Sequence, residues 1–171
     1  MAKATVEKGG VVIVVGWDKD WLPVHEEIEA TDDIRKTLSS KYLQSNVGRS
    51  YERVVNYAKQ GRNVLFVRAP CQIAGLKNIH SKKLSLEAMK KVTLVDLVCF
   101  GVSSSFLFRK YLDESFDRQK ILEINFRSKD KGWSRSSFKI VKSDGSWVLE
   151  YHSKNGFYYG FSRKLYLRST C

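Results

Sequence analysis

Cys71 stands out among the reactive side chains of this sequence because of the residues on either side of it. It lies in the tetrad Ala-Pro-Cys-Gln at residues 69–72, between an apolar run at 63–67 and the stretch at 73–77. An apolar run ended by proline is typical of a buried strand, so the pattern predicts a strand, a tight turn and a helix. Because a helix N-terminus lowers the pKa of a thiol, we predict that Cys71 is a catalytic redox residue. A small residue buried in a tight turn is the alternative.

A second cysteine, Cys99, follows a similar pattern further along the chain. The apolar run at 92–98 leads into Cys99, and Gly101, Ser103 and Ser104 then precede an amphipathic stretch. Two strand–turn–helix units in succession predict adjacent parallel strands whose turns share one sheet edge, where open α/β sheets bind their ligands. Cys99 ends an apolar strand and is expected to be buried. The small residues after it can cradle a phosphate with free backbone N–H groups.

The N-terminal half also contains the elements that such a sheet needs. A β-branched run at 11–15 predicts a buried strand, and residues 22–29 predict its partner. Helices are expected to begin at Thr31 and near Ser50, and Gly61 is expected to end the second of them.

The periodicity changes in the C-terminal part of the chain. From residue 121 the apolar residues alternate with polar ones, which predicts antiparallel strands joined by a hairpin turn at 143–146. Residues 156–166 predict an aromatic-rich helix. The predicted fold class is therefore α/β: a mixed sheet with a parallel βαβ core, flanking helices and a C-terminal antiparallel hairpin. No linker is evident, so a single α/β domain is predicted over residues 1–171.

The composition limits the possible partners. Thirty Lys and Arg residues against eighteen Asp and Glu give the 171-residue chain a net charge of +12. This charge suits either a nucleic acid or a phosphorylated cofactor. The basic residues are spread along the chain without a nucleic-acid-binding motif, which favours the cofactor. No apolar run is long enough to span a membrane, and three cysteines without a secretion signal argue against a disulfide framework, so we predict a cytoplasmic protein without a membrane partner.

Five segments resemble the C-terminal domain of the coenzyme F-420 hydrogenase/dehydrogenase beta-subunit family. They are residues 40–45, 70–76, 95–102, 124–127 with 131–133, and 167–171. The resemblance implies a flavin- and iron–sulfur-dependent oxidoreductase domain that transfers electrons or hydride to a two-electron acceptor, which is the deazaflavin coenzyme in some relatives and another organic substrate in others. It also implies FAD in the full-length protein and an electron-transfer partner subunit or module.

The resemblance further implies which residues bind the flavin or deazaflavin cofactor. Twelve are expected: Ser40, Lys41, Tyr42, Gln44, Ser45, Pro70, Gln72, Gly101, Ser103, Ser104, Arg127 and Lys131. Lys41 can offset the charge of a pyrophosphate, whereas the alternative for its loop is a solvated connector. Arg127 and Lys131 lie in a turn with Trp133, and cations beside an aromatic ring suit an anionic, stacked cofactor. A solvated basic turn is the alternative there.

Cys171 is implied to be a ligand of a [4Fe–4S] cluster. Such a cluster needs four thiolates, whereas this chain has three cysteines far apart in sequence. We therefore expect a cluster only together with cysteines outside this chain, which makes the chain a fragment of a longer redox protein that is inactive alone. His25, His80 and His152 show no metal-ligand spacing and receive no role. The alternatives to an oxidoreductase are a binding module without cofactors and a basic nucleic-acid-binding domain.

Overall fold

The chain divides into two compact units in the computed structural model, which describes residues 1–135 and 137–171. The first unit consists of Met1–Asp18, Pro23–Leu38 and Ser45–Cys99, and the second consists of Lys19–Leu22, Ser39–Gln44 and Phe100–Cys171. A four-stranded mixed sheet and a separate three-stranded antiparallel sheet confirm the predicted α/β class. The single domain over residues 1–171 stays a prediction.

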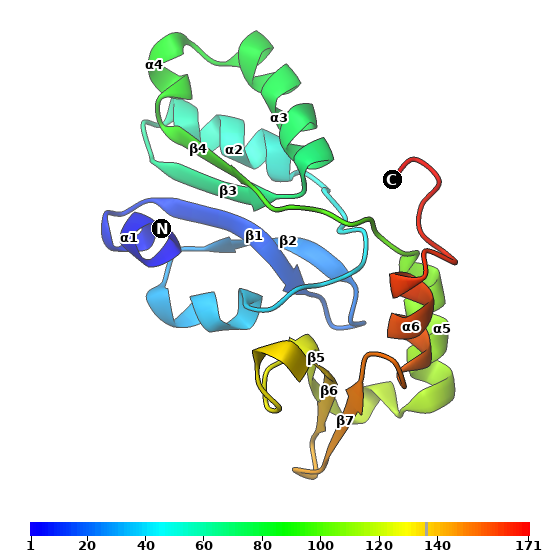
Figure 1. Ribbon diagram of the computed structural model, residues 1–171. Helices are drawn as coiled ribbons and strands as arrows, with labels where there is room; N and C mark the ends of the chain where they lie inside the picture. The colour runs from blue at the N-terminus through cyan, green and yellow to red at the C-terminus, as the bar shows by residue number, and fades with distance from the viewer. Residues whose placement is uncertain (136) are drawn as a thin grey trace. The chain divides into compact units, whose positions relative to one another are not determined.

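The first unit is built on a sheet with the strand order β2–β1–β3–β4 (Figure 1). Its strands are β1 (Val11–Trp17), β2 (Pro23–Ile28), β3 (Val64–Arg68) and β4 (Val92–Asp96). Strand β2 runs antiparallel to β1, whereas β1, β3 and β4 are parallel. The prediction that the strands before Cys71 and Cys99 are parallel neighbours is therefore confirmed.

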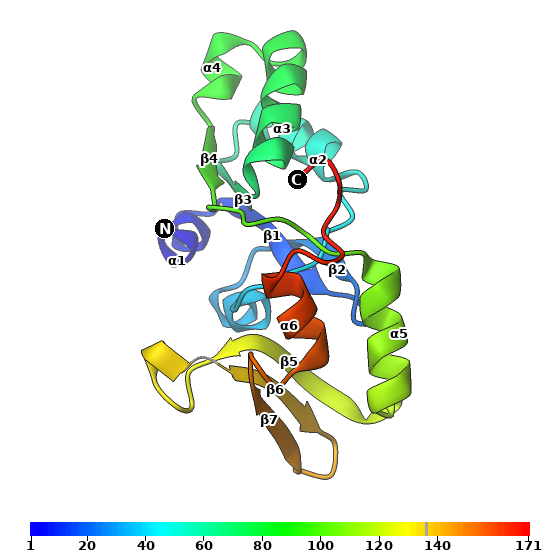
Figure 2. The same cartoon turned by 45° about the vertical axis from the view of Figure 1, so that its right-hand side comes forward.

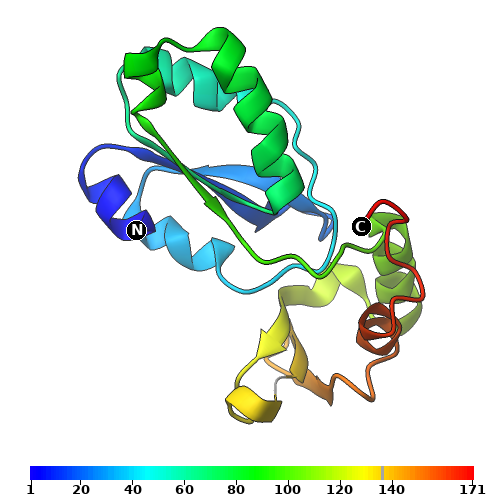
Figure 3. The same ribbon diagram turned by 45° about the horizontal axis from the view of Figure 1, so that its top comes forward.

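Helices cover both faces of this sheet, because residues on its central strands are apolar on both sides. Helices α2 (Ser50–Lys59) and α3 (Pro70–Lys83) pack on one face, with α1 (Ala2–Glu7) and the 3₁₀ helix Thr31–Thr37 on the other (Figure 3). The first core contains Val11, Ile13, Val54, Val64, Phe66, Ile73 and Leu76, and the second contains Val6, Val12, Ile28 and Leu65.

Local sequence signals account for the ends of these helices. Gly61 follows α2 with a φ of +79°, a conformation that glycine adopts without steric cost. Pro70 occupies the first position of α3, where no helical hydrogen bond is lost. The short helix α4 (Leu86–Met89) precedes β4, and the Ser85 hydroxyl accepts a hydrogen bond from the Ala88 amide at 3.3 Å. Sequence patterns therefore predicted the strands, α2 and α3 in their correct order, whereas α1 and α4 were not predicted.

The second unit contains the sheet β5–β6–β7 and two longer helices (Figure 2). The elements are α5 (Ser105–Ser115), β5 (Ile121–Ser128), β6 (Ser137–Lys142), β7 (Trp147–Tyr151) and α6 (Gly156–Ser162), with 3₁₀ turns at Arg118–Lys120 and Trp133–Arg135. Its core is aromatic: the ring centroids of Phe108 and Phe157 are 4.9 Å apart, and those of Phe126 and Phe138 are 5.3 Å apart. The predicted hairpin between β6 and β7 is confirmed, whereas α6 ends before residue 166.

Two local predictions are wrong. Cys99 is exposed rather than buried, because β4 ends at Asp96 and the chain leaves the sheet before the apolar run is over. The predicted helix after Cys99 is α5, which begins only at Ser105 and belongs to the second unit. Leu122 is exposed while Ile124 is buried, because a register irregularity between Ile121 and Glu123 interrupts the alternation of β5.

Among the described residues, no helix combines the length and the apolar composition that crossing a bilayer would require.

Candidate functional site

The first turn of α3 begins two residues after the carboxyl end of β3 and carries the predicted residues of the first unit. Pro70 and Cys71 are exposed, and Gln72 is half-buried. The Ala69 carbonyl accepts hydrogen bonds from the amides of both Gln72, at 3.0 Å, and Ile73, at 3.1 Å. These two N–H groups are therefore occupied within the turn. In the described part of the chain, the Cys71 amide is the first-turn donor without such a partner, so the helix end offers fewer free donors than the sequence suggested.

Ser45 and Gln72 are brought together by the fold. The Gln72 Nε2 atom donates to the Ser45 carbonyl and lies 3.2 Å from the Ser45 Oγ, which itself lies 3.3 Å from Gln72 Oε1. Ser45 is buried, whereas Gln72 retains partial exposure. Two of the predicted loops therefore meet beside Cys71.

A buried arginine that the sequence analysis did not single out lies at the same strand end. Arg68 is the last residue of β3 and is only 2% exposed. Its alternation with Phe66 places it on the face covered by α2 and α3, and its Cζ lies 5.5 Å from the centroid of the Phe66 ring. Burial lowers the pKa of Arg68 to about 9, so the guanidinium is still charged at neutral pH. The sequence did contain a signal for this residue. The arginine continues the alternation of buried side chains at the end of an apolar strand.

His25 lies on β2, close to this guanidinium. The strand register pairs His25 with Val15, and its ring stacks on that of Phe66 with centroids 5.8 Å apart. Burial and then the charge of Arg68 lower the pKa of His25 to about 3, so the imidazole is neutral. Its Nδ1 lies 2.7 Å from the Asn46 carbonyl, which can only accept a hydrogen bond. This contact assigns the proton to Nδ1 and leaves Nε2 as an acceptor.

Tyr51 connects Phe66 of β3 with the first turn of α3. Its hydroxyl donates to the Gln72 carbonyl at 2.7 Å, and its ring packs edge-on against Phe66 with centroids 5.9 Å apart. Burial raises the pKa of Tyr51. The nearby Cys71 adds to this increase, and the positive charge of Arg68 opposes it. Gly75 leaves room for the ring, since a Cβ there would lie 3.0 Å from the Tyr51 hydroxyl. The strand end, the tyrosine and the helix turn thus form one polar cluster.

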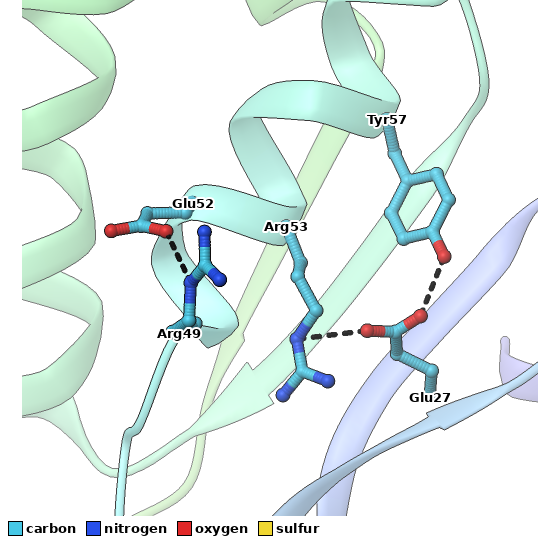
Figure 4. Close-up of polar contacts among 5 residues, drawn as sticks. All are labelled: Glu27, Arg49, Glu52, Arg53 and Tyr57. Atoms are coloured by element: carbon cyan, nitrogen blue, oxygen red, sulfur yellow. Dashed lines mark hydrogen bonds and ion pairs between the residues drawn. The ribbon is translucent and has the colours of Figure 1, made fainter.

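A neighbouring arginine on α2 is paired with an acid (Figure 4). The Arg53 Nε lies 2.8 Å from Glu27 Oε1, and the Tyr57 hydroxyl donates to the other oxygen of Glu27 at 2.5 Å. Arg49 pairs with Glu52 at 2.7 Å in the same view. Glu27 therefore has two partners of its own.

The second unit brings together another group of predicted residues. Ser103 is buried, and both its hydroxyl, at 3.0 Å, and its amide, at 3.3 Å, donate to the Tyr42 carbonyl. The Gln44 amide donates back to the Ser103 carbonyl at 3.4 Å, and its side-chain carbonyl accepts from Arg168 Nη1 at 3.1 Å. Segments 40–44 and 101–104 are thus neighbours within this unit, together with 167–168.

Gly101 provides space for the C-terminal segment. It is buried with a φ of +138°, and a Cβ at this position would lie 2.7 Å from Leu167 Cδ1 and 3.6 Å from Cys171 Cβ. The Cys171 amide donates to the Arg168 carbonyl at 2.9 Å. Glycine at 101 therefore permits the close passage of the strand-like segment that ends in Cys171.

The basic turn of the second unit stays exposed. Arg127 and Lys131 are both on the surface, as are Ser40 and Ser104. The Lys129 ammonium stands 3.3 Å from the centroid of the Trp133 ring, and Asp130 forms an ion pair with Lys139 at 2.6 Å. The cation–aromatic arrangement therefore involves Lys129, while the roles of Arg127 and Lys131 stay predictions.

The cysteines do not form a metal site by themselves. Cys71, Cys99 and Cys171 are free and exposed, and no group of three or more His, Cys, Asp or Glu residues suited to a metal ion exists among the described residues. Three thiols cannot supply the four ligands of a [4Fe–4S] centre. A complete cluster therefore does not fit the residues of this chain alone.

Comparisons with known proteins agree with the sequence resemblance. Residues 61–171 match the family that is described as the C terminus of the coenzyme F420 hydrogenase/dehydrogenase beta subunit. A chain of the F420-reducing [NiFe] hydrogenase complex from Methanosarcina barkeri has a similar structure, with a TM-score of 0.63 and 16% sequence identity over 98% of the present chain. The present chain spans 54% of that chain. None of the curated protein sequences gives a significant match.

Proposed function

Because the chain belongs to the family formed by the C-terminal region of the coenzyme F420 hydrogenase/dehydrogenase beta subunit, we propose that it is part of an oxidoreductase that uses a flavin and an iron–sulfur cluster. Its electron acceptor would be a two-electron carrier such as a deazaflavin, supplied together with a partner subunit or module. The similarity to a chain of a hydrogenase complex supports this assembly. A bound flavin supplies hydride or single-electron transfer, and the protein supplies binding and orientation.

The polar cluster at the carboxyl end of β3 carries this proposal. It combines an unpaired buried guanidinium, that of Arg68, with the exposed thiol of Cys71 and the Ser45–Gln72 pair. An anionic cofactor suits such a place, because it compensates the buried positive charge. The role of Cys71 would be to place a thiol beside the bound cofactor, and Gln72 would fix the loop at Ser45.

The predicted residues of the second unit form a separate part of this proposal. Lys41 adds positive charge, and the backbone of Tyr42, Gln44 and Ser103 is held in place by the hydrogen bonds described above. Cys171 would ligate a cluster together with cysteines outside this chain. Gly101 supports that role, since it leaves room for the segment that presents Cys171.

Flavin binding by the 171-residue chain is the direct test. Mixing the chain with FAD, followed by gel filtration, should leave flavin absorbance in the protein peak, and a Cys71→Ala variant should keep it, because the thiol is proposed to act in redox chemistry rather than in binding. A Gln72→Ala variant should retain less flavin, since the link to Ser45 is lost. Protein that emerges colourless would favour a binding module without cofactors, and salt-dependent oligonucleotide binding would favour the nucleic-acid alternative.

A further inference from the structure

We propose that Arg68 and His25 form a binding site for a phosphate group, either free phosphate or a phosphate monoester, at the carboxyl end of β3. The site lies wholly within the first unit, between β2, β3 and the first turn of α3. It deepens the proposed function, since Arg68 belongs to the cluster that is proposed to compensate an anionic cofactor, but phosphate binding can be measured without any flavin.

The guanidinium of Arg68 is buried without hydrogen-bond partners on one edge. Its Nε and Nη2 atoms are both fully buried, and neither has a partner among the described residues. These two nitrogens form the same edge of the planar guanidinium, the edge that binds two oxygens of a phosphate or carboxylate at once. A buried cation with this edge unpaired is strongly unfavourable, so the fold carries a cost that an anion would remove.

No acidic side chain compensates this charge. Asp96 is the register partner of Arg68 on β4, yet it is exposed, and no ion pair joins the two within the described ranges. Glu27, on β2, already contacts Arg53 and Tyr57. Arg53 adds a second positive charge that acts on His25, and Tyr51, whose pKa is raised by burial, is neutral at pH 7. The local field is therefore positive.

His25 contributes a hydrogen-bond acceptor to the site. A site for a fully deprotonated anion would be expected to contain a donor at this place instead. It is 6% exposed, its Nδ1–H donates to Asn46, and its Nε2 is buried without a partner. Nε2 consequently presents a lone pair in a ring that packs on Phe66, as Arg68 does, and that feels the charge of Arg68. A ligand that satisfies both residues must offer acceptor oxygens to Arg68 and an O–H to His25. A phosphate that keeps a proton meets this requirement. Inorganic phosphate carries at least one proton at neutral pH, whereas a monoester, whose last proton leaves at about pH 6, meets it only as its monoanion.

The first turn of α3 would provide one further donor. Pro70 and Cys71 are exposed directly after the buried strand end, and Tyr51, which packs on Phe66, donates to the Gln72 carbonyl of this turn. The unpaired Cys71 amide lies at the positive end of a fourteen-residue helix. Such an amide favours a phosphate oxygen over a neutral group.

Sulfate provides the decisive comparison, because it matches phosphate in shape and charge but carries no proton at neutral pH. Isothermal titration of the 171-residue chain, at constant ionic strength set with chloride, should give phosphate binding that is roughly three- to tenfold tighter than sulfate binding, as expected for one added hydrogen bond. The affinities for glycerol phosphate and inorganic phosphate are then compared. This comparison shows whether the site prefers a monoester or the free anion.

Two variants and one control separate the roles of the residues. Arg68→Gln should weaken the binding of both phosphate and sulfate by about tenfold or more, because it removes a charged hydrogen-bond donor. His25→Asn keeps a donor for the Asn46 carbonyl but removes the Nε2 acceptor, so it should abolish the preference for phosphate while sulfate still binds. Arg62→Gln is the matched control. Arg62 already pairs with Glu29 at 2.7 Å, so this variant should leave the affinities for both anions unchanged.

Three results would overturn the proposal. They are the lack of any phosphate binding by the unmodified chain, equal binding of phosphate and sulfate by it, and unchanged affinities in Arg68→Gln. The first two concern the unmodified protein and decide the question even when a variant does not fold. A chain that binds phosphate but no flavin would support this site while contradicting the proposed function.

Discussion

Acidification should destabilise the first unit, and the largest part of this effect should come from one side chain, His25. Its ring is buried on the face of the sheet under α2 and α3, and its pKa in the folded protein is lowered to about 3 from 6.5, first by burial and then by the charge of Arg68. Arg53 lowers it further, and the bond to the Asn46 carbonyl partly opposes these effects. The folded protein therefore keeps His25 neutral at a pH where the unfolded chain protonates it.

The magnitude follows from the difference between the two pKa values. Because the folded state has the lower pKa, the unfolded state binds more protons between about pH 6.5 and 3, and stability falls as the pH decreases through this window. Inside this window, each decrease of one pH unit lowers the free energy of unfolding by about 1.4 kcal/mol. Going from about pH 7.5 to about pH 4.5 should thus remove about 2.7 kcal/mol of the free energy of unfolding. The contribution is fully present above the unfolded pKa.

Urea unfolding at the two pH values, with the His25→Asn variant beside the unmodified chain, measures this effect. Burial also lowers the pKa values of His80 and His152, so both proteins lose some stability in acid. The additional loss in the unmodified chain isolates His25. Its imidazole carbon and proton shifts, followed by NMR, should show no titration near pH 6.5, whereas Arg68→Gln should raise its pKa.

The reasoning would be refuted by two observations. One is an equal loss of stability in the unmodified chain and the His25→Asn variant. The other is an NMR titration of His25 with an ordinary midpoint, which would mean that the ring is solvated or faces no positive charge.

Three further predictions concern the cofactors and the second unit. Lys41→Ala should weaken flavin binding by about 1.5–3 kcal/mol, the range for a hydrogen bond to a charged group, whereas Lys82→Ala should have no effect; equal affinities in a flavin titration would move the site elsewhere. The chain alone should not hold a stoichiometric [4Fe–4S] cluster after anaerobic reconstitution, because it lacks a fourth thiolate, and iron and sulfide analysis decides this. Asn155→Ala should lower the free energy of unfolding by about 2–4 kcal/mol, since Asn155 is buried, caps α6 through the Tyr158 amide and donates to Glu150 and Tyr111. Denaturant unfolding measures that loss, and Asn125→Ala, which removes only an exposed acceptor for the Arg127 amide, should change stability by less than about 1 kcal/mol.

The sequence by itself determined those features that depend on neighbouring residues. The apolar run before Pro70 predicted β3, the proline predicted the start of α3, and Cys71 accordingly lies in the first turn of that helix. The alternation around residues 137–151 likewise predicted the hairpin of β6 and β7. Side-chain periodicity and turn chemistry act over a few residues, so they can be read locally.

Only the tertiary structure decided which polar groups are buried together. His25 and Arg68 are far apart in sequence, and the sheet order β2–β1–β3 places them beside Phe66. Local patterns also could not show that β4 ends at Asp96, which leaves Cys99 exposed. Strand order, and the point at which a strand loses its partner, depend on pairing between distant segments. Local periodicity carries no information about that pairing, and the buried charge of Arg68 is a consequence of it.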